Sequence, residues 1–483
     1  MKNKDRKVGS LSLLLGTLVL AMGLTGRLSA QEPPATAEPP AETEAAEETP
    51  KSVEERLDEI DQQLRVLGRK GEIDQEAAAE KAKTATSATS GSKDGFSLKS
   101  ADGAFVLKIR GYVQFDGRFY ADDEVRPAVD TFVLRRVRPI LEGTLWKIFD
   151  YRVMPDFGGG TTVLQDAYLE TRFSPLFKVR AGKFKPPVGL ERLQSGTDIL
   201  FVERGLPTAL VPNRDLGIQL SGDLAEGRVS YAAGVWNGVV DGGSGDLDSN
   251  SGKDAAARLF FQPFLKADST ALRGLGFGVA ASRGSQQGTA TATGLAAYRT
   301  DGQQTFFSYR SDGTLVGTAI ANGSRERLSP QLTWYAGPFG LLAEYVASSQ
   351  EVRRGTVAAD LENRSWQVAG SWVLGGGGQP SYKAVTPKKP FDPANHTWGA
   401  FELAARYAEL DVDDDAFPLF ANPTSAASLA KAWSVGLNWY FNKNIRWALN
   451  YAVTTFEGGA AAGAAIGDRE DEKVLLSRFQ VSF

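Results

Sequence analysis

The sequence contains no cysteine and one histidine, His396, among its 483 residues. Without cysteine, the chain can form no disulfide, no zinc–thiolate site and no thiol nucleophile. With one histidine, a metal centre built from several histidines is excluded, and a Ser-His-Asp triad would need His396 as its base. Because no serine is identifiable as its partner, we expect no enzyme, no metal site and no cofactor.

The chain also lacks an excess of positive charge. It carries 54 Lys+Arg against 58 Asp+Glu, a formal net charge of −4, which argues against a nucleic-acid-binding protein. Beyond the first 30 residues, no segment approaches the roughly 20 consecutive apolar residues that a membrane-spanning helix needs. If the protein lies in a membrane, it must therefore cross it in another way.

The N-terminal 51 residues differ in composition from the rest. Lys2, Lys4 and Arg6 precede an apolar run over residues 8–24, and small residues lead up to Ala30. This pattern predicts a secretory signal peptide over 1–30, although a retained membrane anchor would look similar. Residues 31–51 are mostly Pro, Ala, Glu and Thr, and we expect a disordered spacer.

A short periodic stretch follows the spacer. Apolar residues are spaced by four, three, four and three positions over 52–70, which is the a/d seam of a coiled coil: Val53, Leu57, Ile60, Leu64 and Leu67. The seam favours self-association, and the alternative is one amphipathic helix packed on its own chain. Residues 71–95 are predicted to be a linker.

From residue 96 onward, apolar residues recur at every second position. In one example, Trp433, Val435 and Leu437 alternate with small or polar residues. Such alternation predicts strands with one apolar and one polar face. The segments are about ten residues or longer and no helical run separates them, which favours a transmembrane β-barrel over a soluble sandwich. We therefore expect an all-β barrel over 96–483 in a bacterial outer membrane.

Sixteen antiparallel strands account for the barrel region. A further candidate at 294–310 is assigned to a loop, because an odd count is unusual for bacterial single-chain barrels. Long and short connections then alternate, except that 376–396 is long where a turn is expected. The predicted strands are 104–119, 130–146, 148–156, 162–173, 176–185, 215–224, 226–237, 256–265, 274–284, 327–336, 338–350, 363–375, 397–409, 432–441, 446–457 and 472–483.

Ordered motifs in the first half of the barrel carry a family resemblance. They include GYVQFD at 111–116, FVLRRVR at 132–138, DAYLE at 166–170, RAGKFKPP at 180–187 and ERGLP at 203–207. In this order they resemble the phosphate-selective porin O/P family. The resemblance implies a sixteen-stranded homotrimeric barrel for passive diffusion of small anions, with phosphate favoured. It would also bring three N-terminal helices together on the periplasmic side.

Two other functions remain open on the same scaffold. The barrel could be a diffusion channel for general or other solutes, or a structural protein whose N-terminal segment contacts the cell wall. One departure from the family bears on this choice, since phosphate-selective members carry a ladder of closely spaced arginines. No Arg-x-Arg-x-Arg sequence is present here, so the chain departs from the pattern of strictly phosphate-selective members.

The pore is expected to be narrowed by the connection 186–214, because the third external loop of sixteen-stranded porins commonly folds inward. Guanidinium groups suit oxyanions, since their fork matches phosphate geometry and stays charged. The alternative is that these charges are simply solvated groups of the lumen. The candidate pore and anion-binding residues are Arg135, Arg136, Arg138, Asp166, Lys183, Lys185, Arg192, Arg204 and Arg214.

Strand alternation assigns some side chains to the lumen. On 162–173, the apolar positions face lipid, so Asp166, Tyr168, Glu170 and Arg172 face the lumen. Arg136 and Arg138 share one face, whereas a regular strand would turn Arg135 towards lipid at a cost of about 2–4 kcal/mol at midplane. We therefore expect either a bulge that turns Arg135 inward or a place near the rim.

Overall fold

The computed structural model describes residues 52–84, 87–92, 95–248, 250–463 and 465–483. The predicted signal peptide (1–30) and spacer (31–51) lie outside these residues. The chain divides into two compact units, Met1–Ile73 and Asp74–Phe483. None of the described helices is long and apolar enough to cross a bilayer.

The N-terminal helix α1 spans Val53–Thr84. A capping box begins it: the Ser52 N–H donates to Glu55 Oε2 at 2.9 Å and the Glu55 N–H donates to Ser52 Oγ at 3.2 Å. The structure differs here from the predicted helix over 52–70 and linker over 71–95. Residues 72–84 carry no apolar seam, but they are rich in Ala, Glu and Lys, which are strong helix formers.

Two short strands follow α1, β1 (Ser87–Ser92) and β2 (Gly95–Lys99). They pair with each other, and β2 also pairs with β3 (Val106–Ala121), where Phe96 lies opposite Ile109. The segment predicted to be a linker therefore ends as a hairpin that is hydrogen-bonded to the barrel wall.

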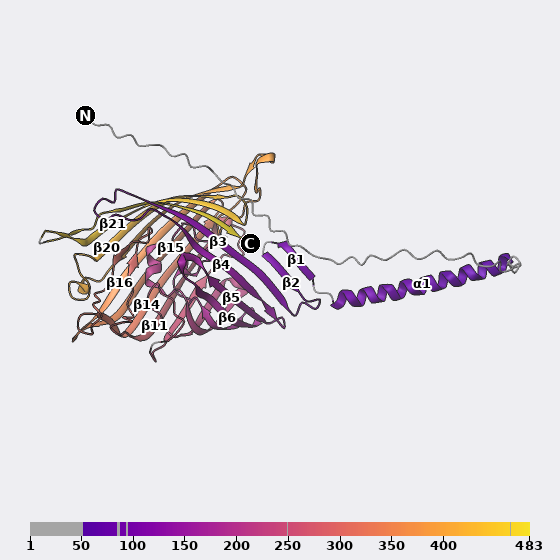
Figure 1. Cartoon of the computed structure of the whole chain (residues 1–483), viewed down its shortest axis with the longest axis horizontal. Coiled ribbons are helices and arrows are strands. Elements are labelled where there is room, and N and C mark those ends of the chain that lie inside the picture. Colours follow the sequence, from indigo (N-terminus) through magenta and orange to yellow (C-terminus); the bar gives the residue numbers. More distant parts are fainter. Residues whose placement is uncertain (1–51, 85–86, 93–94, 249, 464) are drawn as a thin grey trace, which may run out of the picture. The chain divides into compact units, whose positions relative to one another are not determined.

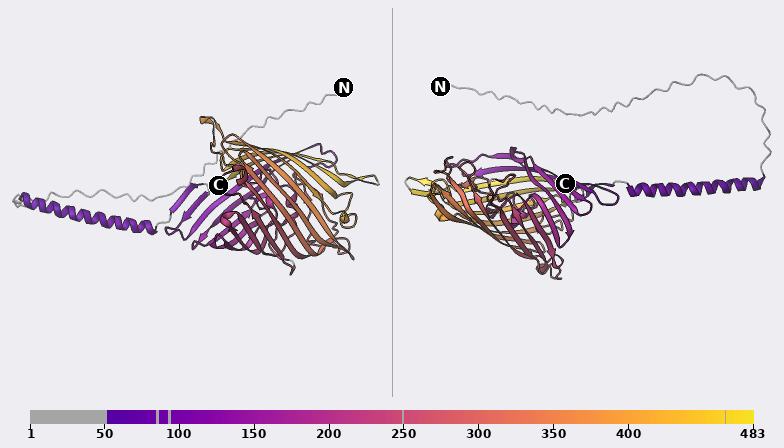
Figure 2. Two further views of the ribbon diagram at one scale, coloured as in Figure 1. Left: turned by 180° about the vertical axis from the view of Figure 1, so that it is seen from behind. Right: turned by 90° about the horizontal axis from the view of Figure 1, so that it is seen from below.

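The barrel is a closed antiparallel sheet of sixteen strands in the described part of the chain, which confirms the predicted fold class and strand number. Its strands tilt strongly and run side by side around the lumen (Figure 2). After β3 they are β4 (Thr131–Leu145), β5 (Phe149–Asp156), β6 (Val163–Ser174), β7 (Phe177–Phe184), β8 (Asp215–Leu224), β9 (Val229–Trp236), β10 (Asp254–Phe261), β11 (Leu275–Gln287), β14 (Ala319–Ala336), β15 (Phe339–Arg354), β16 (Val357–Leu374), β19 (Ala400–Asp411), β20 (Ala427–Tyr440), β21 (Ile445–Ala462) and β23 (Glu472–Ser482).

The first and last barrel strands close the wall. Phe479 of β23 lies opposite Phe115 of β3, and the yellow strands of the C-terminal part lie beside the purple β3 (Figure 1). Beyond β23, the terminal Phe483 and Gly111 exchange two backbone hydrogen bonds of 3.0 Å each. The C-terminal residue thus completes the seam of the barrel.

The two ends of the barrel differ in their connections. We call the end with turns such as 175–176, 225–228 and 337–338 the turn end, and the opposite end, with connections such as 185–214 and 288–318, the loop end. Within 294–310, β12 (Tyr298–Arg299) and β13 (Thr305–Phe307) pair with each other outside the barrel sheet. The assignment of this segment to a loop is confirmed.

The outer wall is apolar and carries aromatic side chains near the turn end. The Phe339 and Trp372 rings stack there at 6.2 Å, and the Phe401 and Trp439 rings stack at 5.4 Å. Further along the strands, Trp433 and Tyr451 make an edge contact at 5.9 Å. Aromatic belts that bound an apolar wall are typical of barrels that sit in a bilayer.

Strand β6 confirms the predicted orientation of its side chains. Leu169 and Phe173 are 46% and 64% exposed on the outer wall, whereas Asp166 and Glu170 are buried on the inner side. Tyr168 shares that inner side, where its ring lies under the guanidinium of Arg180 at 4.3 Å. Alternation along this strand therefore separates a lipid face from a lumen face.

Candidate functional site

The connection 185–214, which we call the inward loop, crosses the lumen as predicted. Its helical turn α2 (Leu190–Leu193) docks on β15 and β16. Glu344 accepts the N–H of Leu190 at 2.6 Å and that of Glu191 at 3.3 Å, while Gln367 Nε2 donates to Glu191 Oε2 at 2.9 Å. The two bonds to Glu344 satisfy the first backbone donors of the turn, which would otherwise be unpaired.

The inward loop then runs along β19, β20 and β21. Asn450 Oδ1 accepts the Val202 N–H at 2.6 Å, and Arg446 Nη1 donates to the Ile199 carbonyl at 2.8 Å. The Phe201 ring lies 4.4 Å from the guanidinium carbon of Arg406. Side chains of the wall thus hold the loop backbone from several directions.

Further segments enter the lumen, among them two that sequence reasoning did not predict. From the loop end, Asp301 accepts from Arg406 at 2.7 Å and from Ser434 at 2.8 Å. From the turn end, the long connection 375–399 brings Tyr382 to the inward loop, where its hydroxyl donates to the Leu190 carbonyl. Gln194 Nε2 in turn donates to the Tyr382 carbonyl at 3.0 Å.

These segments fill the lumen beside strands β14 to β21. A buried apolar cluster joins the inward loop, the segment 288–318 and the wall, and it includes Leu210, Phe306, Phe307, Val352 and Leu361. A second cluster packs Val385 of the turn-end connection against Val373 and Tyr440. The cavities that remain lie on the other side of the lumen, beside β3 to β10.

A β-bulge on β4 turns Arg135 inward, which confirms the first of the two predicted possibilities. Gln114 pairs with Arg136 while the next residue, Phe115, pairs with Leu134, so Arg135 is the extra residue. Gly158 packs on this bulge, and a Cβ there would come within 2.7 Å of the Arg135 carbonyl oxygen.

Asp156 of β5 also stabilises this part of β4. Its Oδ1 accepts the Val137 N–H at 3.0 Å and the Gly158 N–H at 3.1 Å. Its other oxygen accepts from Arg138 Nε at 2.7 Å. The bulge that re-aims Arg135 is therefore held by a buried carboxylate on the neighbouring strand.

Four arginines of the wall surround the carboxylate of Glu203, which belongs to the inward loop. Arg135 Nε donates to its Oε1 at 2.6 Å, and nitrogens of Arg478, Arg118 and Arg136 lie at 3.5, 3.7 and 3.7 Å. Burial alone would raise the pKa of Glu203, but these guanidinium groups hold the pKa well below its usual range. The carboxylate is therefore ionised at neutral pH.

A cavity of about 410 Å³ lies beside this cluster, and we call it the loop-side cavity. Seven arginines and two carboxylates are among the described residues that line it. Arg192 Nε is buried without a hydrogen-bond partner in the described part of the chain. The charged lining residues are Arg135, Arg136, Arg138, Arg192, Arg204, Arg214, Arg299, Asp156 and Glu203.

A second cavity of about 340 Å³, the turn-side cavity, shares Arg214 with the first. Among its described lining residues, five cations face one carboxylate: Arg152, Arg180, Lys185, Arg214 and Arg258 against Asp166. A third hollow of about 450 Å³ at the loop end, the vestibule, shares Arg299 and Gln303 with the loop-side cavity. Positive side chains thus dominate the two inner cavities, whereas basic and acidic residues are balanced in the vestibule.

The predicted site residues largely come together here. Asp166 accepts from Arg214 at 2.9 Å, Lys185 Nζ donates to the Gln194 carbonyl at 2.6 Å, and Arg204 Nη2 donates to the same carbonyl at 2.8 Å. Arg192 donates to the Thr208 carbonyl. All four basic residues line one or both cavities.

Lys183 lies elsewhere. The structure pairs it with Asp246 of the connection between β9 and β10, and it lines neither cavity. It occupies the outward position opposite Ala167. Regular alternation from the inward Arg180 already gives this outward position, so strand parity argues against the predicted place of Lys183 in the pore.

Sequence reasoning missed several residues that line these cavities or hold the inward loop. Strand alternation could have placed Arg152, Arg180 and Arg258 in the lumen, because each lies between outward apolar neighbours. Glu203 lies in the connection 186–214 and in the motif at 203–207, but no role was predicted for it. No local signal could have assigned Arg299, since the inward path of 288–318 depends on tertiary packing.

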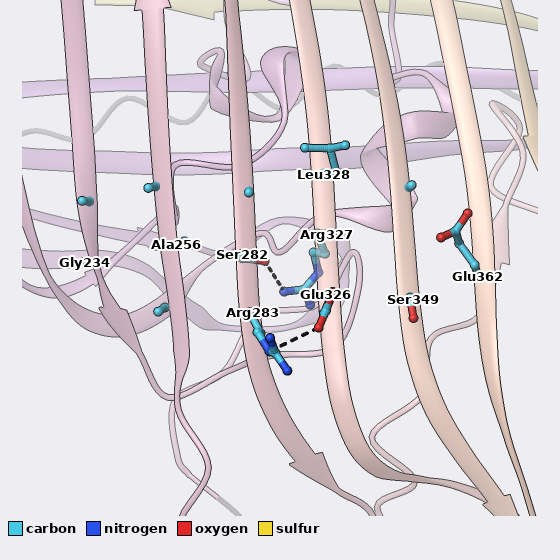
Figure 3. Close-up of a pocket in the computed structure, with 14 residues that line it drawn as sticks. Gly234, Ala256, Ser282, Arg283, Glu326, Arg327, Leu328, Ser349 and Glu362 are labelled. Carbon is cyan, nitrogen blue, oxygen red and sulfur yellow. Dashed lines mark hydrogen bonds and ion pairs between the residues drawn. The ribbon is translucent and has the colours of Figure 1, made fainter.

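Another hollow, of about 680 Å³, is not part of this path. Small residues of β9 to β11 line it, including Ala255, Ala257 and Ala281. At its edge, Arg283 and Glu326 form an exposed ion pair at 3.2 Å, while the neighbouring Arg327 turns the other way to meet Ser282 (Figure 3). This hollow therefore belongs to the outer face of the wall.

Comparisons with known proteins agree with this architecture. The chain is similar to Porin O of Pseudomonas aeruginosa, with 26% identity over 390 residues that cover 74% of this chain and 85% of Porin O. Among solved structures it is similar to the outer membrane channel DcaP of Acinetobacter baumannii, with 12% identity and a TM-score of 0.51, covering 80% of this chain and 99% of DcaP.

A family model gives the assignment. The model described as phosphate-selective porin O and P matches residues 107–483, which is the whole barrel from its first strand to its last residue. The barrel accordingly belongs in the bacterial outer membrane. On this match, together with the closed wall of sixteen strands, the chain belongs to the phosphate-selective porin O and P family.

Proposed function

We propose that this porin conducts small anions by passive diffusion and that it favours phosphate. The observation that carries the proposal is the lining of the loop-side cavity, where seven arginines face two carboxylates. An apolar wall and packed loops surround these charges, so their field is focused on the passage rather than dispersed in water. The anion preference is thus local, because the chain as a whole is slightly acidic.

The path would begin in the vestibule, pass the loop-side cavity and continue into the turn-side cavity. Residues shared between neighbouring cavities support this order. Arginine forks bind phosphate oxygens in pairs, which supports phosphate over chloride. Asp156, Asp166 and Glu203 would compete with the anion for these guanidinium groups and so keep it moving.

The proposal extends to the assembly and orientation of the chain. The protein would form a homotrimer, with the turn end and the N-terminal segment in the periplasm. The export signal predicted over 1–30 and the short turns support this orientation. Transport would need no catalytic group and no cofactor.

A planar-bilayer recording tests the proposal. Under a KCl gradient, we expect the reversal potential to show preference for chloride over potassium, and phosphate added to the bath to block the chloride current. Equal permeability of both ions would instead support a general diffusion channel. Anion preference without phosphate block would retain the anion channel and reject phosphate as its favoured solute.

A further inference from the structure

We propose that the first half of α1 joins the α1 helices of two other copies in a parallel, in-register, three-stranded coiled coil. The inference rests on the homotrimer of the proposed function and specifies how the N-terminal segments of that trimer interact. It concerns the stretch Val53–Leu67, whose seam side chains are between 53% and 75% exposed in the described chain.

The residue types at the seam indicate the number of strands. With Leu57 and Leu64 at a positions, the d positions are Val53, Ile60 and Leu67. Leucine at a together with β-branched residues at d disfavours a two-stranded coil and favours three or four strands. A copy of the same chain supplies a matching apolar seam, so the occupant of this face is the chain itself.

Charges beside the seam indicate the direction and register. Arg56 occupies a g position and Asp61 the following e position, five residues later. In a parallel in-register coil, a g residue of one helix meets the next e residue of its neighbour, so Arg56 faces the partner subunit's Asp61. Within the chain Asp61 pairs with Arg65 at 2.7 Å, but both side chains are largely exposed, and such pairs contribute little.

The extent of the seam matches a short clamp. The capping box at Ser52 and Glu55 starts the helix just before the first d residue. After Leu67 the next a position is Gly71 and the next d position is Asp74, so no apolar contact continues the coil. The remaining helix to Thr84 can then diverge towards the separate barrels.

Because the chain contains no cysteine, a single introduced thiol reports on this geometry without ambiguity. We would compare I60C, at a d position, with Q62C, at the outward f position, in the full-length protein in mild detergent. Under mild oxidation we expect I60C to give about tenfold more disulfide-linked chains than Q62C. In a three-stranded layer one thiol stays unpaired, so linked chains should level off at about two-thirds of the total.

The outcomes are distinct. Equal linkage of I60C and Q62C would overturn the proposal, and linkage approaching all chains would indicate two or four strands and overturn the trimeric coil.

Charge variants test the register independently. R56E and D61R should each lower the disulfide linkage of I60C, and the double variant R56E/D61R should restore it. R69E, at an f position, should leave the linkage unchanged. Failure of restoration would reject the parallel register. The ion selectivity of the same samples in planar bilayers tests the anion channel separately from the coiled coil.

Discussion

Arg135 donates through Nε to Glu203 Oε1 at 2.6 Å, which joins a bulge in the barrel wall to the loop that crosses the lumen. Each of these two charged side chains would be unfavourable in its place without the other. The bulge turns an arginine inward that would otherwise face lipid, and the loop carries a carboxylate into a cluster of like charges. Together they fix the position of the loop and set how much positive charge the passage presents.

Removal of the Glu203 charge should change both selectivity and stability. In E203Q, the four surrounding arginines lose their shared counter-charge, so we expect a higher chloride-to-potassium permeability ratio and a loss of about 3 kcal/mol of folding free energy. Bilayer reversal potentials and thermal unfolding of the detergent-solubilised protein measure the two effects. E326Q, in the exposed pair on the outer wall, should change neither. An unchanged ratio in E203Q would mean that ions do not pass near this carboxylate.

The same carboxylate predicts a pH dependence. Its pKa is lowered in the folded protein, so its ionisation stabilises the docked loop above the usual value of about 4.3 and this stabilisation is lost as pH falls below that value. We expect the unfolding temperature of the wild type to fall on acidification below about pH 4. In E203Q, the part of this fall that comes from protonation of Glu203 should be absent. Parallel curves for the two proteins would contradict the role of Glu203 as a docked anion.

Replacement of Arg135 and Arg136 tests the filter. Both line the loop-side cavity, so R135A/R136A should lower the chloride-to-potassium ratio while single-channel current persists. R135K/R136K keeps the charge but loses the bidentate fork, and we expect it to retain chloride selectivity and lose block by phosphate. The matched control is R283A on the outer wall. If R135A/R136A leaves the chloride-to-potassium ratio unaltered, a general diffusion channel would be better supported than an anion channel.

The turn-end connection should limit the conductance. Tyr382 holds 375–399 against the inward loop, so Y382A should release it, open the filled side of the lumen and raise the single-channel conductance. The lost packing should cost about 3 kcal/mol. Y382F keeps the ring and should change the conductance much less. A Y382A channel of wild-type conductance would show that this segment does not narrow the path.

Deletion of Phe483 should impair insertion. This residue exchanges two backbone hydrogen bonds with Gly111, and its ring contacts that of Phe96 at 6.5 Å. A terminal aromatic on such a strand resembles the signal read by the barrel-insertion machinery. We expect a lower yield in the outer membrane with unchanged secretion, measured by membrane fractionation. An unchanged yield would leave Phe483 as an ordinary lipid-facing residue.

The wall of the barrel could be predicted from the sequence because each strand carries its own evidence. Alternation fixes which side of β6 faces lipid, and the cost of an outward Arg135 was enough to suggest the bulge. The inward path of 185–214 came from the resemblance to a family rather than from the residues. The bulge at Arg135 departs from simple alternation, whereas the outward Lys183 obeys it and was misassigned to the pore.

The contents of the lumen could not be predicted in the same way. Asp301 meets Arg406, and Tyr382 meets Leu190, across more than 100 residues of sequence. Nothing local to 288–318 or 375–399 distinguishes a loop that enters the barrel from one that stays outside. The end of α1 was missed for another reason, because Ala, Glu and Lys favour a helix even where no seam marks one.

Because loops fill half of the lumen, the open passage is much narrower than the barrel that encloses it. Sixteen strands enclose far more space than the cavities beside β3 to β10 leave open. Bulky amphiphilic compounds, including many antibiotics, should therefore find no route here even though the barrel itself is large. If the channel conducts small anions as proposed, it would admit them without opening the full width of the barrel.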